Sequence, residues 1–142
     1  METVRQLLDS KGTEVCTIRP DECVLDAIQR MADNDVGALV VVDEGDVVGI
    51  FTERHYAREV FLQGKRSPTT PVRDIMSTQV VCTSPDQSID ECMAVMTEKR
   101  IRHLPVLADG TLVGIISIGD LVKSKIAKQE FTIAELVHYI HG

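Results

Sequence analysis

The sequence predicts an α/β (α+β) fold in which two pseudo-symmetric βαββα repeats pack sheet to sheet and a helix follows at the C-terminus. The first observation is an internal repeat: segments 20–50 and 85–115 align without a gap when the 142-residue chain is shifted by 65 positions. Nine of the 31 aligned pairs are identical, whereas average residue usage gives about two by chance. The second observation is that helical and strand-like apolar patterns recur in the same order in both copies. Each unit can then cover the apolar face that the other leaves exposed.

Each of the two aligned segments begins with an amphipathic helix, because its apolar residues recur at the spacing i, i+3, i+4, i+7. These residues are Val24, Ala27, Ile28 and Met31 in the first copy, and Ile89, Cys92, Met93 and Met96 in the second. Ser88 and Glu91 have the spacing of a capping box at the start of the second helix. The first copy lacks this pair, so its helix is expected to start on Asp21 or without a good cap.

Two apolar strands follow each helix, and their near-continuous apolar runs indicate strands that are covered on both faces. The predicted strands are residues 38–42 and 47–51 in the first copy, and 103–107 and 112–116 in the second. A short strand is expected before each helix, at residues 15–18 and 80–83, and a further helix after each strand pair, from Thr52 and from Ser117. Earlier still, VRQLL (4–8) matches VRDIM (72–76).

The predicted boundaries give a first repeat (1–64), a second repeat (65–128) and a C-terminal helical extension (129–142). The segment QGKRSPTTP (63–71) is interpreted as the link, because its Gly and Pro residues resist helix and strand extension. The extension lies outside the repeat, and a separate helix is expected to begin there at Thr132.

Composition and charge disfavour several classes of protein. Hydrophobic residues make up 44% and charged residues 26%, as in ordinary globular proteins. The net charge of -7 disfavours a nucleic-acid partner, although a local basic cluster can still hold a small phosphate. No apolar run approaches the roughly 20 residues that span a bilayer, and no signal peptide is indicated, so no membrane association and a cytoplasmic location are expected. The four cysteines form no Cys-x-x-Cys pair and are interpreted as plain thiols.

The endings of the two repeats, GIFTERH (49–55) and GIISIGD (114–120), resemble those of the cystathionine-β-synthase (CBS) domain family. Two copies in tandem resemble a Bateman module, and the resemblance covers nearly the whole chain. It implies a regulatory module with no catalytic centre, whose clefts accept AMP, ADP, ATP, NAD(H) or S-adenosylmethionine, commonly within a homodimer. The expected function is therefore that of an energy or redox sensor that acts on an unidentified target protein.

The most specific signature of that family is Gly-x-x-(Thr/Ser)-x-x-Asp, which the second copy fits with Gly114, Ser117 and Asp120. Ser117 is expected where a strand meets a helix, so its hydroxyl and the free backbone N–H groups suit a phosphate. The two oxygens of Asp120 can accept from both hydroxyls of a ribose. The alternative is a capping box that satisfies only its own backbone. Within this repeat, the nucleotide site is favoured.

The first copy departs from the signature, because Thr52 keeps the hydroxyl but His55 stands in place of Asp. The Asp120 cleft is therefore predicted to be the primary site and the His55 cleft a weaker or differently selective one. Phosphate binding there through Arg54 or a protonated ring is one possibility, and a solvated His55 with no binding role is the other.

The resemblance also implies that residues 101–105 line the adenosine cleft, with Arg102 and His103 toward the phosphates. Lys99 and Arg100 are equally well explained as a solvated charge run. The complete set of expected nucleotide-binding residues is Thr17, Gly37, Ala38, Thr52, Arg54, His55, Thr83, Arg102, His103, Leu104, Pro105, Ser117 and Asp120.

Three other classes of function are alternatives. An enzyme would use Cys82 or Cys16 as nucleophile with His103 or His55 as base, but no motif places these groups together. A metal site would rest on the pair His138 and His141 alone. The serious alternative is an interaction module with no nucleotide, in which helices 52–62 and 117–128 and the terminal helix serve dimer contacts.

Overall fold

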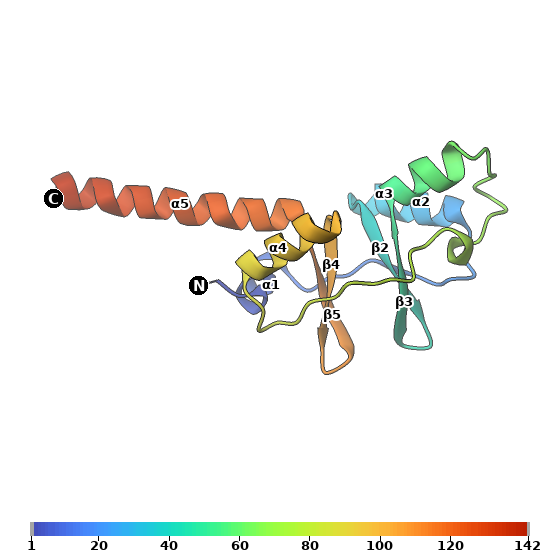
Figure 1. Ribbon diagram of the computed structural model, residues 1–142, viewed down its shortest axis with the longest axis horizontal. Coiled ribbons are helices and arrows are strands. Elements are labelled where there is room, and N and C mark those ends of the chain that lie inside the picture. The colour runs from blue at the N-terminus through green and yellow to red at the C-terminus, as the bar shows by residue number, and fades with distance from the viewer. Residues whose placement is uncertain (1, 142) are drawn as a thin grey trace.

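The structure is a computed structural model that describes residues 2–141, except for the side chains of residues 139–141. Two β-hairpins lie at the centre of the molecule, with most of the helices to one side of them and the last helix reaching far outward (Figure 1). The elements in chain order are α1 (Val4–Lys11), β1 (Thr17–Ile18), α2 (Val24–Asn34), β2 (Ala38–Asp43), β3 (Asp46–Thr52), α3 (Glu53–His55), η1 (Tyr56–Phe61), η2 (Val72–Asp74), α4 (Ile89–Lys99), β4 (His103–Ala108), β5 (Thr111–Ser117) and α5 (Ile118–His141).

The two hairpins repeat each other closely. Strands β2 and β3 pair antiparallel, as do β4 and β5, and each pair has a register shift at the same place, after Val41 and after Val106. Both turns have two consecutive residues of positive φ, Glu44–Gly45 and Asp109–Gly110. This geometry matches the twist of antiparallel strands and explains the Gly at the second turn position. The four predicted hairpin strands are therefore confirmed.

The predicted short first strands are wrong in extent. The first covers only Thr17–Ile18, parallel to β2. The second is reduced to an isolated bridge between Thr83 and Val106, in which the Thr83 N–H donates to the Pro105 carbonyl at 2.9 Å. The chain leaves the sheet directly afterwards at Pro85, which has no N–H to continue a ladder.

The helices that open each repeat are confirmed, and so is the difference between their starts. Helix α2 begins after Cys23 with no side-chain cap, whereas the Ser88 hydroxyl at the start of α4 accepts from the Glu91 N–H at 3.1 Å. Both helices end on a left-handed residue, Asp35 with φ 53° and Arg100 with φ 56°.

The predicted separate terminal helix is wrong, because α5 runs without a break for 24 residues. The Thr132 hydroxyl donates to the Lys128 carbonyl one turn earlier at 3.0 Å, so Thr132 lies inside a helix and does not cap one. Residues 121–141 contain neither Gly nor Pro, and nothing in this segment ends the helix that starts at Ile118. No helix among the described residues combines the length and the apolar character needed to span a membrane.

Two hydrophobic cores form, and each contains a segment from the other half of the chain. Helix α1 contributes Val4, Leu7 and Leu8 to the core of the second repeat. Conversely, Val72 and Ile75 belong to the core of the first repeat. The division at residues 64 and 65 stays a prediction, but packing crosses it in both directions.

Glycine makes the same close approach possible in both halves. A Cβ on Gly114 would lie 2.8 Å from a methyl group of Leu8, and a Cβ on Gly49 would lie 2.5 Å from the sulfur of Met76. Leu8 and Met76 therefore take equivalent places, each over the outer strand of a hairpin. This equivalence supports the alignment of residues 4–8 with residues 72–76.

Candidate functional site

A cleft of about 250 Å³ lies between the two repeats and is lined by residues of both. The first repeat contributes the end of β3 and the short helix α3, and the second contributes the segment before β4 together with residues 77–81. The lining residues are Gly37, Ile50, Thr52, Glu53, Arg54, His55, Ser77, Gln79, Val80, Val81, Arg100, Ile101, Arg102 and His103.

Cationic and imidazole side chains dominate the polar lining of this cleft. Three arginines, Arg54, Arg100 and Arg102, face one carboxylate, that of Glu53. The neighbouring Gly37 leaves room for the ring of His103, because a Cβ there would lie 3.3 Å from Glu53 Oε1 and 3.7 Å from His103 Nε2. The cleft is thus locally positive although the chain carries a net charge of -7.

Thr52 and His55 form a reciprocal pair at the start of α3. The His55 N–H donates to Thr52 Oγ1 at 3.2 Å, and the Thr52 N–H donates to His55 Nδ1 at 3.1 Å. Because Nδ1 accepts, this bond assigns the proton of the neutral ring to Nε2. Burial lowers the pKa of His55, with smaller opposing effects of Glu59 (raising) and Arg54 (lowering). A neutral His55 therefore takes the position and the capping role of the Asp in the other repeat.

Ser117 and Asp120 form the matching pair at the start of α5. The Asp120 N–H donates to Ser117 Oγ at 3.1 Å, and the Ser117 N–H donates to Asp120 Oδ2 at 2.8 Å. The same Oδ2 accepts from Lys11 Nζ at 2.6 Å. Burial acts to raise the pKa of Asp120, but the bonds from Lys11 and Ser117 outweigh it and hold the pKa below its usual value. The capping box expected as the alternative is thus present.

His103 lies between the two pairs. It lines the cleft, and burial lowers its pKa, with Lys11 and Arg102 acting in the same direction and Asp120 opposing. Its imidazole is therefore held neutral close to both the arginine-rich cleft and the Lys11–Asp120 ion pair.

Six of the predicted site residues meet in this one cleft, and seven do not line it. The six are Gly37, Thr52, Arg54, His55, Arg102 and His103. Ser117 and Asp120 form the equivalent pair at the start of α5, and with Lys11 they make up the Ser117–Asp120 corner. Ala38, Leu104 and Pro105 are buried in the sheets, and Thr83 lies in a separate groove beside α4.

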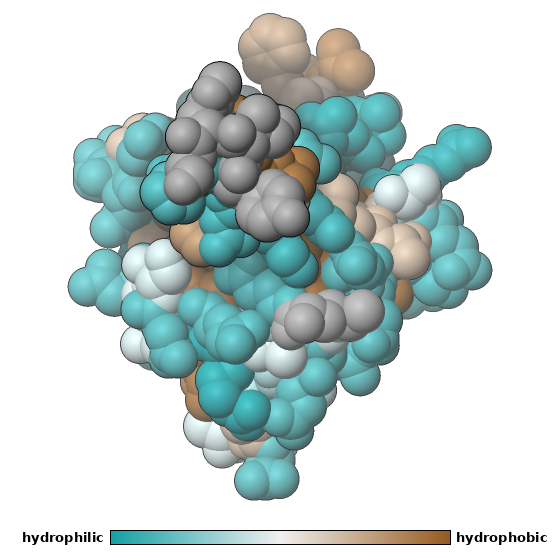
Figure 2. Space-filling view, turned by 90° about the vertical axis from the view of Figure 1, so that its left-hand side faces the viewer, coloured by the Kyte–Doolittle hydropathy of each residue, from teal (hydrophilic) through white to brown (hydrophobic). Residues whose placement is uncertain are grey.

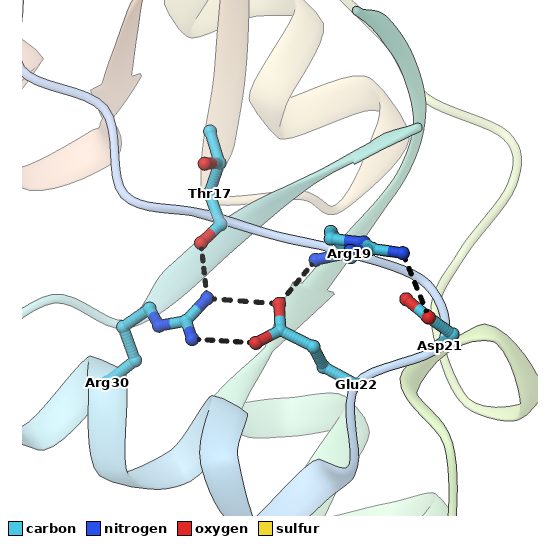
Figure 3. Close-up of polar contacts among 5 residues, drawn as sticks. All are labelled: Thr17, Arg19, Asp21, Glu22 and Arg30. Carbon is cyan, nitrogen blue, oxygen red and sulfur yellow. Dashed lines mark hydrogen bonds and ion pairs between the residues drawn. The ribbon is translucent and has the colours of Figure 1, made fainter. Parts of the chain in front are cut away.

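Thr17 is exposed, and its carbonyl accepts from the Arg30 guanidinium at 2.8 Å (Figure 3). Arg30 in turn forms an ion pair with Glu22 at 2.9 Å, and Glu22 also accepts from the Arg19 N–H. This network joins β1 to α2. The contact of the Thr17 carbonyl therefore stabilises the fold of the first repeat.

Several lining residues escaped the sequence analysis. Ser77, Gln79, Val80 and Val81 follow the segment 72–76, which matches residues 4–8 in sequence. They reach the cleft because residues 72–76 pack against the first half of the chain. The sequence match between residues 4–8 and 72–76 does not reveal this packing.

Cys82, one of the two candidate nucleophiles, lies apart from the described histidines. Cys82 shares a groove with Thr83, Glu91 and Cys92, which no described histidine lines, and burial raises the pKa of its thiol. All four cysteines are free, and Cys82 is exposed. No group of three or more possible metal ligands occurs among the described residues. The side chain of His141 lies outside them.

Comparison with known families decides the identity of the repeats. The model of the CBS domain matches the chain twice, over residues 4–61 and 72–126. The chain belongs to the CBS-domain family. It carries two CBS domains in tandem and is a regulatory module of the CBS-pair type, which confirms the resemblance seen in the repeat endings.

Three proteins illustrate how widely this CBS pair is shared. The chain is 36% identical to the mitochondrial CBS domain-containing protein CBSX3 of Arabidopsis thaliana, over 99% of this chain and 72% of that protein. It is 53% identical to a CBS-domain protein of known structure from Burkholderia ambifaria MC40-6, with a TM-score of 0.86 over 89% of this chain and 96% of the other. The CBS domain pair of MJ0100, solved with 5′-methylthioadenosine and S-adenosyl-L-methionine, has the same fold at 24% identity, with a TM-score of 0.81 over 90% and 98% of the two chains.

Proposed function

We propose that this CBS pair binds an adenine nucleotide (AMP, ADP, ATP or NAD(H)) between its two repeats, as a cytoplasmic energy or redox sensor that catalyses no reaction. The observation that carries the proposal is the cleft in which three arginines and two neutral histidines converge in an otherwise acidic protein. Arginine donates in a planar fork that suits phosphate oxygens, and a partly enclosed site reduces screening of that charge.

Adenosine-containing ligands are the class that the fold supports. MJ0100, which shares only the fold with this chain, holds two such compounds in its CBS pair. In this chain the arginines add a preference for the anionic members of that class, because 5′-methylthioadenosine has no phosphate to meet them. The Ser117–Asp120 pair supplies a carboxylate with ribose-binding capacity at the equivalent corner.

Binding is tested by isothermal titration calorimetry and thermal unfolding with AMP, ATP, NAD⁺, NADH and 5′-methylthioadenosine. At least one nucleotide is expected to raise the unfolding midpoint, since a ligand at 100 times its Kd stabilises the folded state by about 2.7 kcal/mol. Arg102→Ala is expected to weaken binding by about 10- to 100-fold, the usual range for a hydrogen bond to a charged group.

The matched control is Arg73→Ala, which removes an exposed arginine of η2 that does not line the cleft. It is expected to leave the affinity unchanged. If no nucleotide binds to the purified protein, the sensor proposal fails and the interaction module becomes the leading function.

Self-association is the second proposal, and exposed apolar residues on the outer helices favour it. Phe61 and Leu62, at the end of η1, are each 72% exposed, and Ile126, which corresponds to Phe61 in the repeat, is 49% exposed. By contrast, the face toward which α5 points is mainly hydrophilic (Figure 2). We propose that η1 and the part of α5 around Ile126 form the contact of a homodimer, because large exposed apolar groups commonly mark interaction sites.

Sedimentation equilibrium tests the dimer. The wild-type protein is expected to sediment as a dimer at micromolar concentration, and Phe61→Glu as a monomer, because a buried carboxylate at the contact is unfavourable. Arg73→Glu, at an exposed residue of η2 outside these helices, should leave the dimer intact. A wild-type monomer, or equal effects of both substitutions, would refute this interface.

A further inference from the structure

The side chain of Lys11 lies against Asp120 in the second half of the chain, and the two residues line an open groove of about 650 Å³ beside α1 and α5. Ile50, Thr52 and His55 line the open cleft, and the 65-residue repeat places Ile115, Ser117 and Asp120 at the equivalent positions. Lys11 Nζ donates to the Ile115 carbonyl and, at 2.6 Å, to Asp120 Oδ2.

The packing of α1 explains how Lys11 reaches this place. Leu8 lies over Gly114 as Met76 lies over Gly49, and three residues farther along the chain come Lys11 and Gln79 respectively. Gln79 lines the open cleft. Aligned by sequence, the two halves therefore differ at two positions: Lys11 contacts Asp120 in one half, and Gln79 lines the same cleft as His55 in the other.

The Lys11–Asp120 pair is costly to break with a neutral ligand. The two side chains are only 30% and 25% exposed. Asp120 Oδ2 already accepts from Lys11 and from the Ser117 N–H, so ribose hydroxyls that displace Lys11 from this oxygen separate a partly buried ion pair, which is unfavourable unless another anion meets the ammonium. A phosphate on the same nucleoside supplies that anion.

We propose that Lys11 is a specificity-determining residue that admits phosphorylated adenosine to the Ser117–Asp120 corner and rejects adenosine without phosphate. This inference rests on the proposed nucleotide binding and assigns the selection to one side chain outside the family's signature motif. It also predicts that the two corners differ in selectivity, because Gln79 holds no charge that a ligand must replace.

The test compares AMP with adenosine on three proteins: wild type, Lys11→Gln and Arg5→Gln. Lys11→Gln gives the second corner the residue that the first has. It is expected to lower the ratio of AMP to adenosine affinity by about 10- to 100-fold, since a hydrogen bond to a charged group is replaced by a neutral one. Arg5 lies on the same helix as Lys11. Arg5→Gln removes its exposed ion pair with Asp86 and should leave the affinity ratio unchanged.

Binding is followed at the Asp120 carboxyl carbon by NMR, so that events at this corner are separated from those in the open cleft. AMP is expected to shift this resonance in the wild type, and adenosine to shift it only in Lys11→Gln. If calorimetry detects AMP but the Asp120 resonance does not move, or if the affinity ratio is the same in Lys11→Gln, the role of Lys11 is refuted while nucleotide binding stands. If no adenine nucleotide binds at all, both proposals fail. Circular dichroism establishes that each variant is folded.

Discussion

Deletion of residues 2–11 is expected to unfold the second half of the chain, although these residues lie at the opposite end of the sequence. Helix α1 places Val4, Leu7 and Leu8 in the core of the second repeat, where their exposed fractions are 0%, 6% and 5%. Burial of each such side chain contributes about 1.5–3 kcal/mol. The combined loss is comparable to the whole stability of a typical domain, which is about 5–15 kcal/mol.

Deletion of residues 133–142 is the matched control, because it removes the same number of residues from the other end. Ile133 and Leu136 in this segment are 60% and 58% exposed, so little core is lost. Circular dichroism and urea unfolding should show a stable protein for this deletion and the loss of cooperative structure for the first. A protein without residues 2–11 that unfolds at the wild-type urea concentration would contradict the exchange of segments.

The substitution Phe51→Ala is expected to destabilise the protein by about 3–5 kcal/mol, the usual cost of removing a buried aromatic ring. Phe51 lies in β3 with no exposed surface, in the core of the first repeat. Its ring also lies 6.4 Å from that of His55, so the cavity would open beneath the cleft as well as inside the core.

Phe131→Ala provides the comparison, since it makes the same chemical change at a side chain that is 64% exposed. Its effect is expected to stay within about 0.5 kcal/mol. Both free energies of unfolding come from chemical denaturation monitored by circular dichroism. Equal costs for the two substitutions would show that Phe51 does not support the core as described.

The parts of the fold that could be predicted are those for which the same local sequence pattern occurs in both repeats. The hairpins follow from apolar runs around Glu44–Gly45 and Asp109–Gly110, and the repeat made each prediction support the other. The capped and uncapped helix starts were likewise visible, because the presence of Ser88 and its absence from the first copy are local facts.

The parts that could not be predicted depend on tertiary packing. The match of residues 4–8 with 72–76 shows that the two segments are alike, but not that each packs on the other half. Without that exchange, neither Lys11 beside Asp120 nor Gln79 in the cleft can be anticipated. At Thr132 the local cap signal was misleading, since the uninterrupted helix before it already satisfied the backbone.

Because α5 is uninterrupted, a movement at the Ser117–Asp120 corner also moves the whole length of this helix. The helix starts directly after Ser117 and, with 24 residues, is about 36 Å long. Its far end stands clear of the two hairpins (Figure 1). By geometry, a tilt of about 5° at the base displaces the tip by about 3 Å. A tilt of α5 that is too small to disturb the packing of the two cores is therefore large enough to change the surface that the tip of α5 presents to a neighbouring molecule.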